Sequence, residues 1–373
     1  MRILISGGGT GGHIYPALAV AKVLQTTYGA EILYLGDERG LETELVPKAG
    51  FSFFGIRAGK LRRYLSWKTL TDLGRVPLGF TQAIGHVRRF RPDAAFTSGG
   101  YVSVPAGFAA RSTRVPLVIH QQDVSPNLAN RLLRPLATRI SVSFEDSLRY
   151  FPARKTLLMG NPVREAILKV VEMNPAAAKQ TFGLDPALPL VVVTGGSQGA
   201  KHLNEIVVKS LPQLLPICQV LQISGTRTFA ETRSASTAQL EGHPDWAARY
   251  RLYEYLDAEM APALAAADIV LCRSGASTLS ELATLGKPSV LIPLPPGFGG
   301  SPQAINAAMF ERRGAASVIS DADLTPSTLE ATLLPLLNNE ARRGTLAAGA
   351  RSLARLNAAA DLAALVAELA KKE

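Results

Sequence analysis

Residues 3–13 (ILISGGGTGGH) are a short β-branched strand that runs directly into a glycine-rich turn. The same arrangement returns at residues 191–199 (VVVTGGSQG). A buried parallel strand that leads into a glycine loop and then a helix leaves backbone N–H groups and the positive end of the helix dipole facing a crevice, which suits phosphate. The doubling predicts two nucleotide-fold domains that face each other with a ligand between them.

Short apolar runs alternate with helix-period stretches along the whole chain. This rhythm is typical of βαβ units and of a parallel sheet, so the predicted fold class is α/β with two Rossmann-like domains. In the first half we expect a helix at residues 14–28 and strands at residues 2–6, 31–35, 94–97, 116–120 and 139–143. In the second half we expect strands at residues 190–194, 219–223, 250–253, 268–272, 288–292 and 316–318.

Glycine and proline interrupt this rhythm at residues 159–164 (MGNPVR), where we place the domain boundary. The first domain is then residues 1–161 and the second residues 162–339. The Ala-rich stretch at residues 340–373 is helical in pattern and has no strand left to serve. We expect this tail to pack back onto the first domain, which would make that domain discontinuous.

Composition sets the class of protein. The chain has 373 residues, 47% of them hydrophobic and 19% charged, which is enough for two domains with their own cores and is typical of an α/β enzyme. Cys218 and Cys272 are too few for a disulfide framework and indicate a reducing compartment. No signal peptide or membrane-spanning run is evident, so we expect a cytosolic protein. Asp, Glu and His show no metal-ligand spacing, and we expect no metal and no cofactor.

The net charge of +10 is concentrated in one segment, residues 57–91. Nine basic residues lie there against one acid, Asp72, and apolar side chains are interleaved with them. Cations beside apolar groups fit an anionic membrane surface. The alternative is an ordinary helix with a core face and a solvated basic face. Nucleic acid is disfavoured as a partner because no nucleic-acid recognition motif accompanies the charge.

The first glycine turn permits a second reading of the function. Gly7, Gly9 and Gly12 are a formal match to the dinucleotide fingerprint, and Asp37 ends the next strand, where a ribose-binding acid would lie. A nicotinamide or flavin dehydrogenase is therefore an alternative, although it leaves the second glycine loop without a role. Neither glycine run continues into Gly-Lys-Ser/Thr, which excludes a Walker nucleotide loop.

Two further features can carry chemistry. His13 lies at the start of the helix after the first loop, where its imidazole could accept a proton or merely hydrogen-bond a backbone carbonyl. Residues 273–281 (RSGASTLSE) follow a strand and resemble another anion cradle. Glu281 falls about one turn into that helix, where it could bind a ribose or simply stabilise the helix dipole.

Six ordered motifs, taken together, resemble the MurG family of bacterial cell-wall N-acetylglucosaminyltransferases. The resemblance runs from Gly7 to about Gly314 and is specific because the motifs keep their order and spacing. The motifs are residues 8–18 (GGTGGHIYPAL), 99–105 (GGYVSVP), 120–123 (HQQD) with Pro126, Asn130 and Arg131, 160–164 (GNPVR), 195–200 (GGSQGA), and 273–281 followed by 286–288 (GKP).

The resemblance implies a GT-B fold, with the lipid acceptor on the N-terminal domain and the sugar nucleotide mainly on the C-terminal one. It implies inverting transfer of GlcNAc from UDP-GlcNAc to the C4 hydroxyl of the MurNAc of undecaprenyl-diphospho-MurNAc-pentapeptide (lipid I), giving lipid II for peptidoglycan. It also implies a peripheral protein on the cytoplasmic face of the cell inner membrane. Another UDP-GlcNAc-using GT-B enzyme, such as a 2-epimerase, and a non-catalytic membrane-surface protein remain alternatives.

The same resemblance assigns expected roles to residues of this chain. The general base is His13 or Asp123. Ser197 and Arg164 would approach the diphosphate, the Leu256 backbone the uracil, Glu281 the ribose and Gln303 the GlcNAc. The full set of substrate-binding residues is Thr10, Gly11, Gly12, Asp123, Arg164, Ser197, Gln198, Leu256, Ala276, Ser277, Thr278, Leu279, Ser280, Glu281 and Gln303, with Tyr101 and Asn130 on the acceptor side.

The chain also departs from the family pattern. The family usually has His-Glu-Gln-Asn where this chain has HQQD at residues 120–123, so Asp123 replaces an amide and a nearby acid is lost. Asp123 is then either an acceptor-only substitute or the base itself. The loop at residues 295–302 (PPGFGGSP) lacks the polar sequence usually found before the glutamine that corresponds to Gln303.

Overall fold

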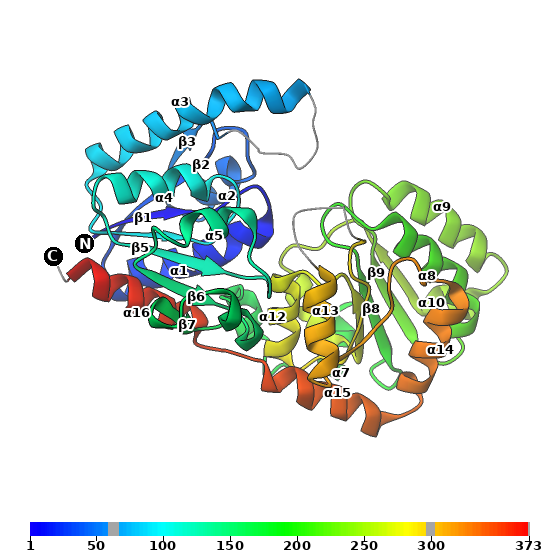
Figure 1. The fold of residues 1–373 in the computed structure, drawn as a ribbon. Helices are drawn as coiled ribbons and strands as arrows, with labels where there is room; N and C mark the ends of the chain where they lie inside the picture. Colours follow the sequence, from blue (N-terminus) through cyan, green and yellow to red (C-terminus); the bar gives the residue numbers. More distant parts are fainter. Residues whose placement is uncertain (59–66, 296–302, 372–373) are drawn as a thin grey trace. The chain divides into compact units, whose positions relative to one another are not determined.

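The computed structural model describes residues 1–58, 67–295 and 303–371, and the chain divides into two compact units (Figure 1). The first unit is Met1–Arg164 together with Arg355–Glu373, and the second is Glu165–Ala354. Each unit is a wholly parallel sheet covered by helices, so the predicted α/β class is confirmed.

The first unit has seven strands in the order β3-β2-β1-β4-β5-β6-β7. The strands are β1 (Arg2–Ser6), β2 (Glu31–Asp37), β3 (Ser52–Ile56), β4 (Ala94–Thr97), β5 (Leu117–Gln121), β6 (Arg139–Val142) and β7 (Thr156–Leu158). Its helices are α1 (Gly11–Tyr28), α2 (Glu42–Lys48), α3 (Trp67–Phe90), α4 (Ser103–Ser112), α5 (Leu128–Leu133) and α16 (Ala358–Lys371), with 3₁₀ turns η1 (Glu145–Tyr150) and η2 (Ala153–Lys155).

The second unit has six strands in the order β10-β9-β8-β11-β12-β13. They are β8 (Leu190–Thr194), β9 (Gln219–Ile223), β10 (Tyr250–Tyr253), β11 (Ile269–Cys272), β12 (Ser289–Leu291) and β13 (Ala316–Val318). The helices are α6 (Glu165–Lys169), α7 (Pro175–Thr181), α8 (Lys201–Leu214), α9 (Phe229–Leu240), α10 (Pro244–Ala248), α11 (Met260–Ala266), α12 (Ala276–Leu285), α13 (Gln303–Arg312), α14 (Pro326–Leu337) and α15 (Glu340–Ser352).

The central strands of both sheets are buried on both faces. Every residue of β8 is buried, which is why its sequence is a continuous apolar run rather than an alternating one. All the expected strands are present within two residues at each end. The structure adds β3 and β7, which lie at the two edges of the first sheet. Edge strands are short and half-exposed, so their apolar pattern is weak.

The two sheets share one topological feature that positions a site. In the first sheet the strand order reverses between β1 and β4, and in the second it reverses between β8 and β11. Ligands of open parallel sheets bind beyond the carboxyl ends of the strands at such a switch point. The glycine loops after β1 and β8 both lie at these points.

The tail expected as one helix over residues 340–373 is two helices. Ala347 and Ala350 of α15 are buried in the second unit, where α15 packs on α12 and α14. Leu362 and Val366 of α16 are fully buried in the core of the first unit, where α16 packs on α1 and β4 (Figure 1). The tail divides because its two halves serve different hydrophobic cores.

A buried histidine on β5 connects that strand to β6 and to the segment that follows β7. His120 on β5 is fully enclosed, with Nδ1 3.0 Å from the Ser141 hydroxyl and Nε2 3.0 Å from Asn161 Oδ1. Since the amide oxygen can only accept, Nε2 carries the hydrogen and Nδ1 accepts from Ser141. Burial lowers the pKa of His120 to about 4, so the ring is neutral at pH 7.

Removal of a core side chain from α16 tests whether the tail is part of the first unit. Leu362→Ala should lower the free energy of unfolding of that unit by about 2–5 kcal/mol, because the buried isobutyl group leaves a cavity. Leu356→Ala is the matched control, since Leu356 is 52% exposed, and should change stability by about 0.5 kcal/mol at most. Urea unfolding curves measure both, and equal values for the two variants would contradict this packing.

The pKa of His120 predicts an acid-dependent loss of stability. The unfolded imidazole takes up a proton near pH 6.5, whereas the folded one does so only near pH 4. The free energy of unfolding is therefore complete above pH 6.5 and falls as the pH drops toward 4, by about 2 kcal/mol between pH 7 and pH 5. His120→Gln should remove this part of the pH dependence in urea unfolding. An identical fall in wild type and variant would show that His120 is not its source.

Candidate active site

Two glycine loops meet backbone to backbone at the switch point of the first sheet. A Cβ on Gly100, whose φ is +86°, would lie 2.2 Å from the Gly8 carbonyl oxygen, and a Cβ on Gly7 would lie 1.9 Å from Ser98 Oγ. The Tyr34 hydroxyl donates to the Gly7 carbonyl at 2.5 Å and anchors the first loop from the sheet. Only glycine permits this approach of the loop after β1 to the loop after β4.

His13 is held by this junction. Its Nδ1 lies 3.1 Å from the Ser98 carbonyl oxygen, which also accepts from Gln122 Nε2 at 3.0 Å, and the Ser98 hydroxyl donates to the His13 carbonyl at 2.6 Å. A carbonyl oxygen only accepts, so Nδ1 carries the hydrogen of the neutral ring and Nε2 presents the lone pair. Burial lowers the pKa of His13, and the Asp123 carboxylate opposes that shift. The hydrogen bond to a backbone carbonyl is therefore present, and it sets a tautomer that leaves Nε2 able to accept a proton.

Asp123 lies just beyond the end of β5 and is 7% exposed. It is the charged group that acts most strongly on His13. Gln121 shapes this loop, since its Nε2 donates to the carbonyls of Asp123 at 2.8 Å and Ser125 at 2.9 Å. An ionised carboxylate at position 121 could not donate these bonds, so the conformation of this loop requires the amide of Gln121.

The two expected acceptor-side residues have different surroundings. The Tyr101 hydroxyl donates to Asp37 Oδ2, and its ring lies where a Cβ on Gly9 would clash, at 2.8 Å. Asn130 is fully buried and donates both amide hydrogens, to the His120 carbonyl at 2.9 Å and to Gln121 Oε1 at 2.8 Å. Asn130 therefore fixes the loop from the interior, and its amide is not presented at the surface of the unit.

The sequence analysis missed Glu42, a carboxylate that is 0% exposed. Its oxygens accept from the backbone N–H of Asp37 at 2.9 Å and of Gly9 at 3.4 Å, and a Cβ on Gly8 would lie 2.2 Å from Oε1. Glu42 thus supports the first glycine loop from α2. The one available signal was its place in the first turn of a short helix, which suggests only a dipole-stabilising acid.

The second unit repeats the glycine junction. A Cβ on Gly199, whose φ is +81°, would lie 2.2 Å from the Ser224 carbonyl oxygen, so the loop after β8 packs closely on the end of β9. Ser197 and Gln198 are exposed on this loop, and the Ser197 carbonyl accepts from Thr226 N at 3.2 Å. The loop therefore turns its polar side chains outward at the switch point.

The second cradle lies at the start of α12, where the cap residue Gly275 has no side chain. The Ser274 hydroxyl donates to the Gln303 carbonyl at 2.9 Å, and Gln303 Oε1 accepts from Leu294 N at 3.1 Å. The Gln303 amide nitrogen lies 3.9 Å from where a Cβ on Gly275 would be, beside the helix N-terminus. Of the predicted residues on α12, Ser277 and Thr278 are half-buried and the others are buried, namely Ala276, Leu279, Ser280 and Glu281.

The remaining predicted residues are placed as follows. Arg164 ends the first segment of the first unit, with its guanidinium carbon 5.7 Å from the Tyr15 ring centroid. Leu256 follows β10 and is 7% exposed. Thr10 is exposed before α1, while Gly11 and Gly12 begin that helix. Residues 296–302 of the proline- and glycine-rich loop lie outside the described residues.

The described part of the chain contains neither a candidate metal site nor a candidate membrane-spanning helix. Within residues 1–58, 67–295 and 303–371, three or more His, Cys, Asp or Glu side chains do not gather in an arrangement that could hold a metal ion. In the same ranges, every helix is too short or too polar to cross a membrane.

Family models match both halves of the chain. The glycosyltransferase family 28 N-terminal domain matches residues 3–142, and the family 28 C-terminal domain matches residues 190–366. A protein of Caldanaerobacter subterraneus subsp. tengcongensis is 39% identical over 98% of this chain and 99% of its own length. One from Desulforamulus reducens is 36% identical over 97% of both chains. Both are named "UDP-N-acetylglucosamine--N-acetylmuramyl-(pentapeptide) pyrophosphoryl-undecaprenol N-acetylglucosamine transferase".

Solved structures agree with this assignment. MurG of Acinetobacter baumannii matches with a TM-score of 0.76 and 26% identity, over 98% of this chain and 99% of that one. The UDP-GlcNAc 2-epimerase of Neisseria meningitidis matches with a TM-score of 0.69 over 99% of this chain, but at 15% identity it shows the fold alone. The GT-B fold class is thus confirmed, and the chain belongs to glycosyltransferase family 28 and, within it, to the MurG family of N-acetylglucosaminyltransferases.

Proposed function

We propose that this protein transfers GlcNAc from UDP-GlcNAc to the C4 hydroxyl of the MurNAc of lipid I, with inversion, to give lipid II for peptidoglycan synthesis. The observation that carries this function is the match to transferases of that name at 39% identity over 98% of the chain. The placement of the motif residues at the switch points of both sheets supports it. In the reaction a bond forms between the acceptor oxygen and C1 of GlcNAc, and the bond from C1 to the UDP oxygen breaks.

His13 is the general base of this proposal. Its neutral ring offers Nε2 to the acceptor hydroxyl, and its lowered pKa keeps that nitrogen unprotonated near pH 7. The proton of the C4 hydroxyl passes to His13 Nε2 as the hydroxyl oxygen attacks C1 of GlcNAc. Asp123 then stabilises the imidazolium through its negative charge, which is the direction in which it acts on the pKa of His13. Asp123 is thus a positioning and charge-stabilising residue, while His13 takes the proton.

The donor is assigned to residues of the second unit together with Arg164, the last residue of the first segment of the first unit. The N-terminus of α12 and the loop that carries Ser197 supply backbone N–H groups to the diphosphate, and Arg164 supplies a positive charge. Electrons of the breaking C1–O bond leave with UDP, whose growing negative charge these groups offset without a metal ion. Glu281 is assigned to the ribose and the Leu256 backbone to the uracil. Gln303 is assigned to GlcNAc, because its amide nitrogen lies beside the start of α12.

The acceptor is bound to a lipid, so the enzyme must work at a membrane. We assign docking on the anionic cytoplasmic face of the cell inner membrane to residues 57–91. In the described part of this segment, Ala83 and Val87 face the core, while Leu78 is 41% exposed on the same helix, α3. Exposed Phe108 on α4 contacts Phe80 edge to face at 5.4 Å. The basic residues Lys60, Arg62 and Arg63 lie outside the described residues.

The alternatives lose support. Asp37, which a dehydrogenase would use for the ribose, accepts a hydrogen bond from the Tyr101 hydroxyl. The second glycine loop, which a dehydrogenase leaves without a role, falls within the matched C-terminal family domain. The match to a 2-epimerase is a match of fold at 15% identity.

Transfer of labelled GlcNAc to a short-chain lipid I analogue tests the reaction and the base together. His13→Ala should reduce kcat by about 10²–10⁴-fold, the scale of a lost general base. Asp123→Asn should cost less and should move the acidic limb of the pH–rate profile to lower pH, since loss of the carboxylate lowers the pKa of His13 further. Binding of UDP-GlcNAc, followed by thermal shift, is the control and should be unchanged in both variants.

Each assignment can fail separately in this assay. If Asp123→Asn reduces kcat by about 10²–10⁴-fold and His13→Ala stays active, Asp123 is the base. If the wild type binds UDP-GlcNAc but transfers nothing to the lipid I analogue, the donor assignment stands and the acceptor assignment is wrong. Stabilisation by NADH in place of UDP-GlcNAc would favour the dehydrogenase.

A further inference from the structure

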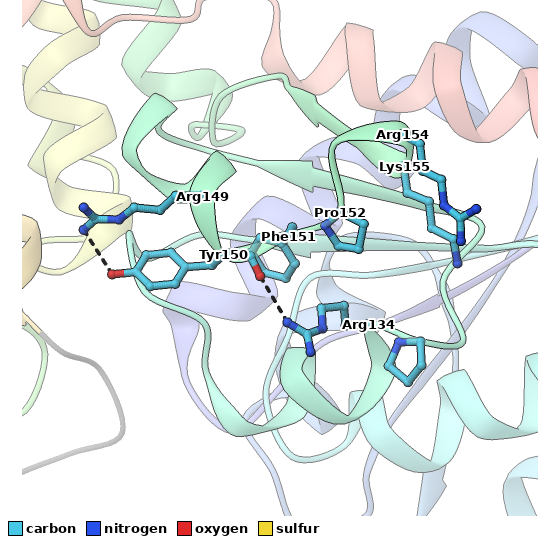
Figure 2. Close-up of a pocket in the computed structure, with 8 residues that line it drawn as sticks. Arg134, Arg149, Tyr150, Phe151, Pro152, Arg154 and Lys155 are labelled. Carbon is cyan, nitrogen blue, oxygen red and sulfur yellow. Dashed lines mark hydrogen bonds between the residues drawn. The ribbon is translucent and has the colours of Figure 1, made fainter.

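A basic hollow lies on the first unit, away from the residues assigned to catalysis (Figure 2). Its volume is about 540 Å³, and it is formed by the residues after α5, the end of η1, and η2. Figure 2 shows Arg149 beside the Tyr150 ring at one end of the drawn residues, Arg154 and Lys155 at the other end beyond Pro152, and Arg134 between them. The lining residues are Arg134, Pro135, Arg149, Tyr150, Phe151, Pro152, Arg154 and Lys155.

Sheet polarity separates this hollow from the active site. Arg134 precedes β6, and Arg154 and Lys155 precede β7, so these three lie toward the amino ends of these parallel strands. Arg149 lies on η1, between the carboxyl end of β6 and the amino end of β7. His13 and Asp123 follow the carboxyl ends of β1 and β5. Arg134, Arg154 and Lys155 are therefore at the opposite end of the strands from His13 and Asp123, neither of which lines the hollow.

The charge of the hollow is unbalanced. Its lining contains four cations and no carboxylate. None of the ion pairs found among the described residues includes Arg134, Arg149, Arg154 or Lys155. Elsewhere in the same unit, Arg39 and Arg57 both lie within ion-pair distance of Glu38. Repulsion among the cations that line the hollow is reduced when an anion binds there.

Tyr150 and nearby carbonyls orient three of the cations. Arg134 Nη1 donates to the Tyr150 carbonyl at 3.2 Å, and Arg149 Nη2 donates to the Tyr150 hydroxyl at 3.0 Å (Figure 2). The Arg149 guanidinium carbon also lies 4.9 Å from the Tyr150 ring centroid. Lys155 Nζ donates to the Ala137 carbonyl at 2.7 Å. Each of these groups has further N–H donors, so the hollow offers several pre-oriented donors to one ligand.

We propose that this hollow is a binding site for a phosphate-bearing anion. A phosphate group has several oxygens that accept hydrogen bonds at once, which suits planar guanidinium groups that donate in pairs. The volume admits a phosphate together with part of the molecule that carries it. A soluble phosphate compound and the headgroup of an anionic lipid share this chemistry. Leu132 on α5 and Leu157 on β7 are about 40% exposed on the elements that form the hollow, so a lipid is tested beside the free ion.

The test compares wild type with Arg149→Gln/Arg154→Gln, which removes two of the charges at exposed positions where folding is not at risk. Arg111→Gln is the matched control, because Arg111 is an exposed arginine at the end of α4 in the same unit and outside the hollow. In the first arm, pyrophosphate is titrated calorimetrically into protein saturated with UDP, which fills the donor diphosphate site. In the second arm, binding to phosphatidylglycerol vesicles is measured by sedimentation against phosphatidylcholine vesicles.

The site should bind pyrophosphate at least tenfold more weakly in the double variant, since charge-assisted hydrogen bonds are lost, and equally well in the control. That result in the first arm supports a site for a soluble phosphate compound. No pyrophosphate binding in the wild type, with at least a tenfold loss of phosphatidylglycerol binding in the double variant alone, supports a lipid headgroup site. Equal behaviour of wild type, double variant and control in both arms overturns the proposal. Transferase activity is not a readout, so this outcome is independent of the proposed function.

Discussion

The carbonyl oxygen of Ser98 is the hydrogen-bond acceptor on which the arrangement of His13 and the neighbouring loops of the first unit depends. It accepts hydrogen bonds from His13 Nδ1 and Gln122 Nε2, and so joins the start of α1 to the loops that follow β4 and β5. A carbonyl cannot donate, and this asymmetry alone sets the tautomer of His13. The approach of the loops that brings Ser98 there is possible because Gly7 and Gly100 have no Cβ. These two glycines therefore permit the contact that fixes the His13 ring.

The second unit uses the same physical arrangement for a different purpose. Its glycine loop also packs against a neighbouring strand end, through Gly199 and the Ser224 carbonyl. A histidine also follows this loop, but His202 at the start of α8 has its Nδ1 3.5 Å from Asp321 Oδ2. The side chains of the loop itself are the polar, exposed Ser197 and Gln198. The start of α12 is likewise fixed from behind, by Ser274 and Gln303. In the proposed reaction, one topology thus supplies the proton acceptor in the first unit and N–H donors for the diphosphate in the second.

The structure explains why residues 120–123 (HQQD) carry an amide at position 121 and a carboxylate at position 123. Gln121 must donate to two carbonyls, which an ionised glutamate cannot do. Asp123 moves the negative charge two residues along, to a position from which it acts on His13. In the proposed reaction this carboxylate stabilises the protonated imidazole of His13.

The amino-acid sequence alone determined the α/β class, the strands of both sheet centres, the family and the glycine loops, because buried parallel strands and glycine turns leave strong local patterns. It could not decide the edge strands β3 and β7, whose short and half-exposed runs are weak signals. Nor could it divide the tail, since only tertiary packing shows that α15 and α16 serve different cores. The support of Gly9 by Glu42 and the tautomer of His13 arise from contacts between residues distant in sequence. The interior position of Asn130 and the basic hollow arise from the packing of neighbouring elements against one another. Such contacts carry no local pattern, because the fold alone brings the partners together.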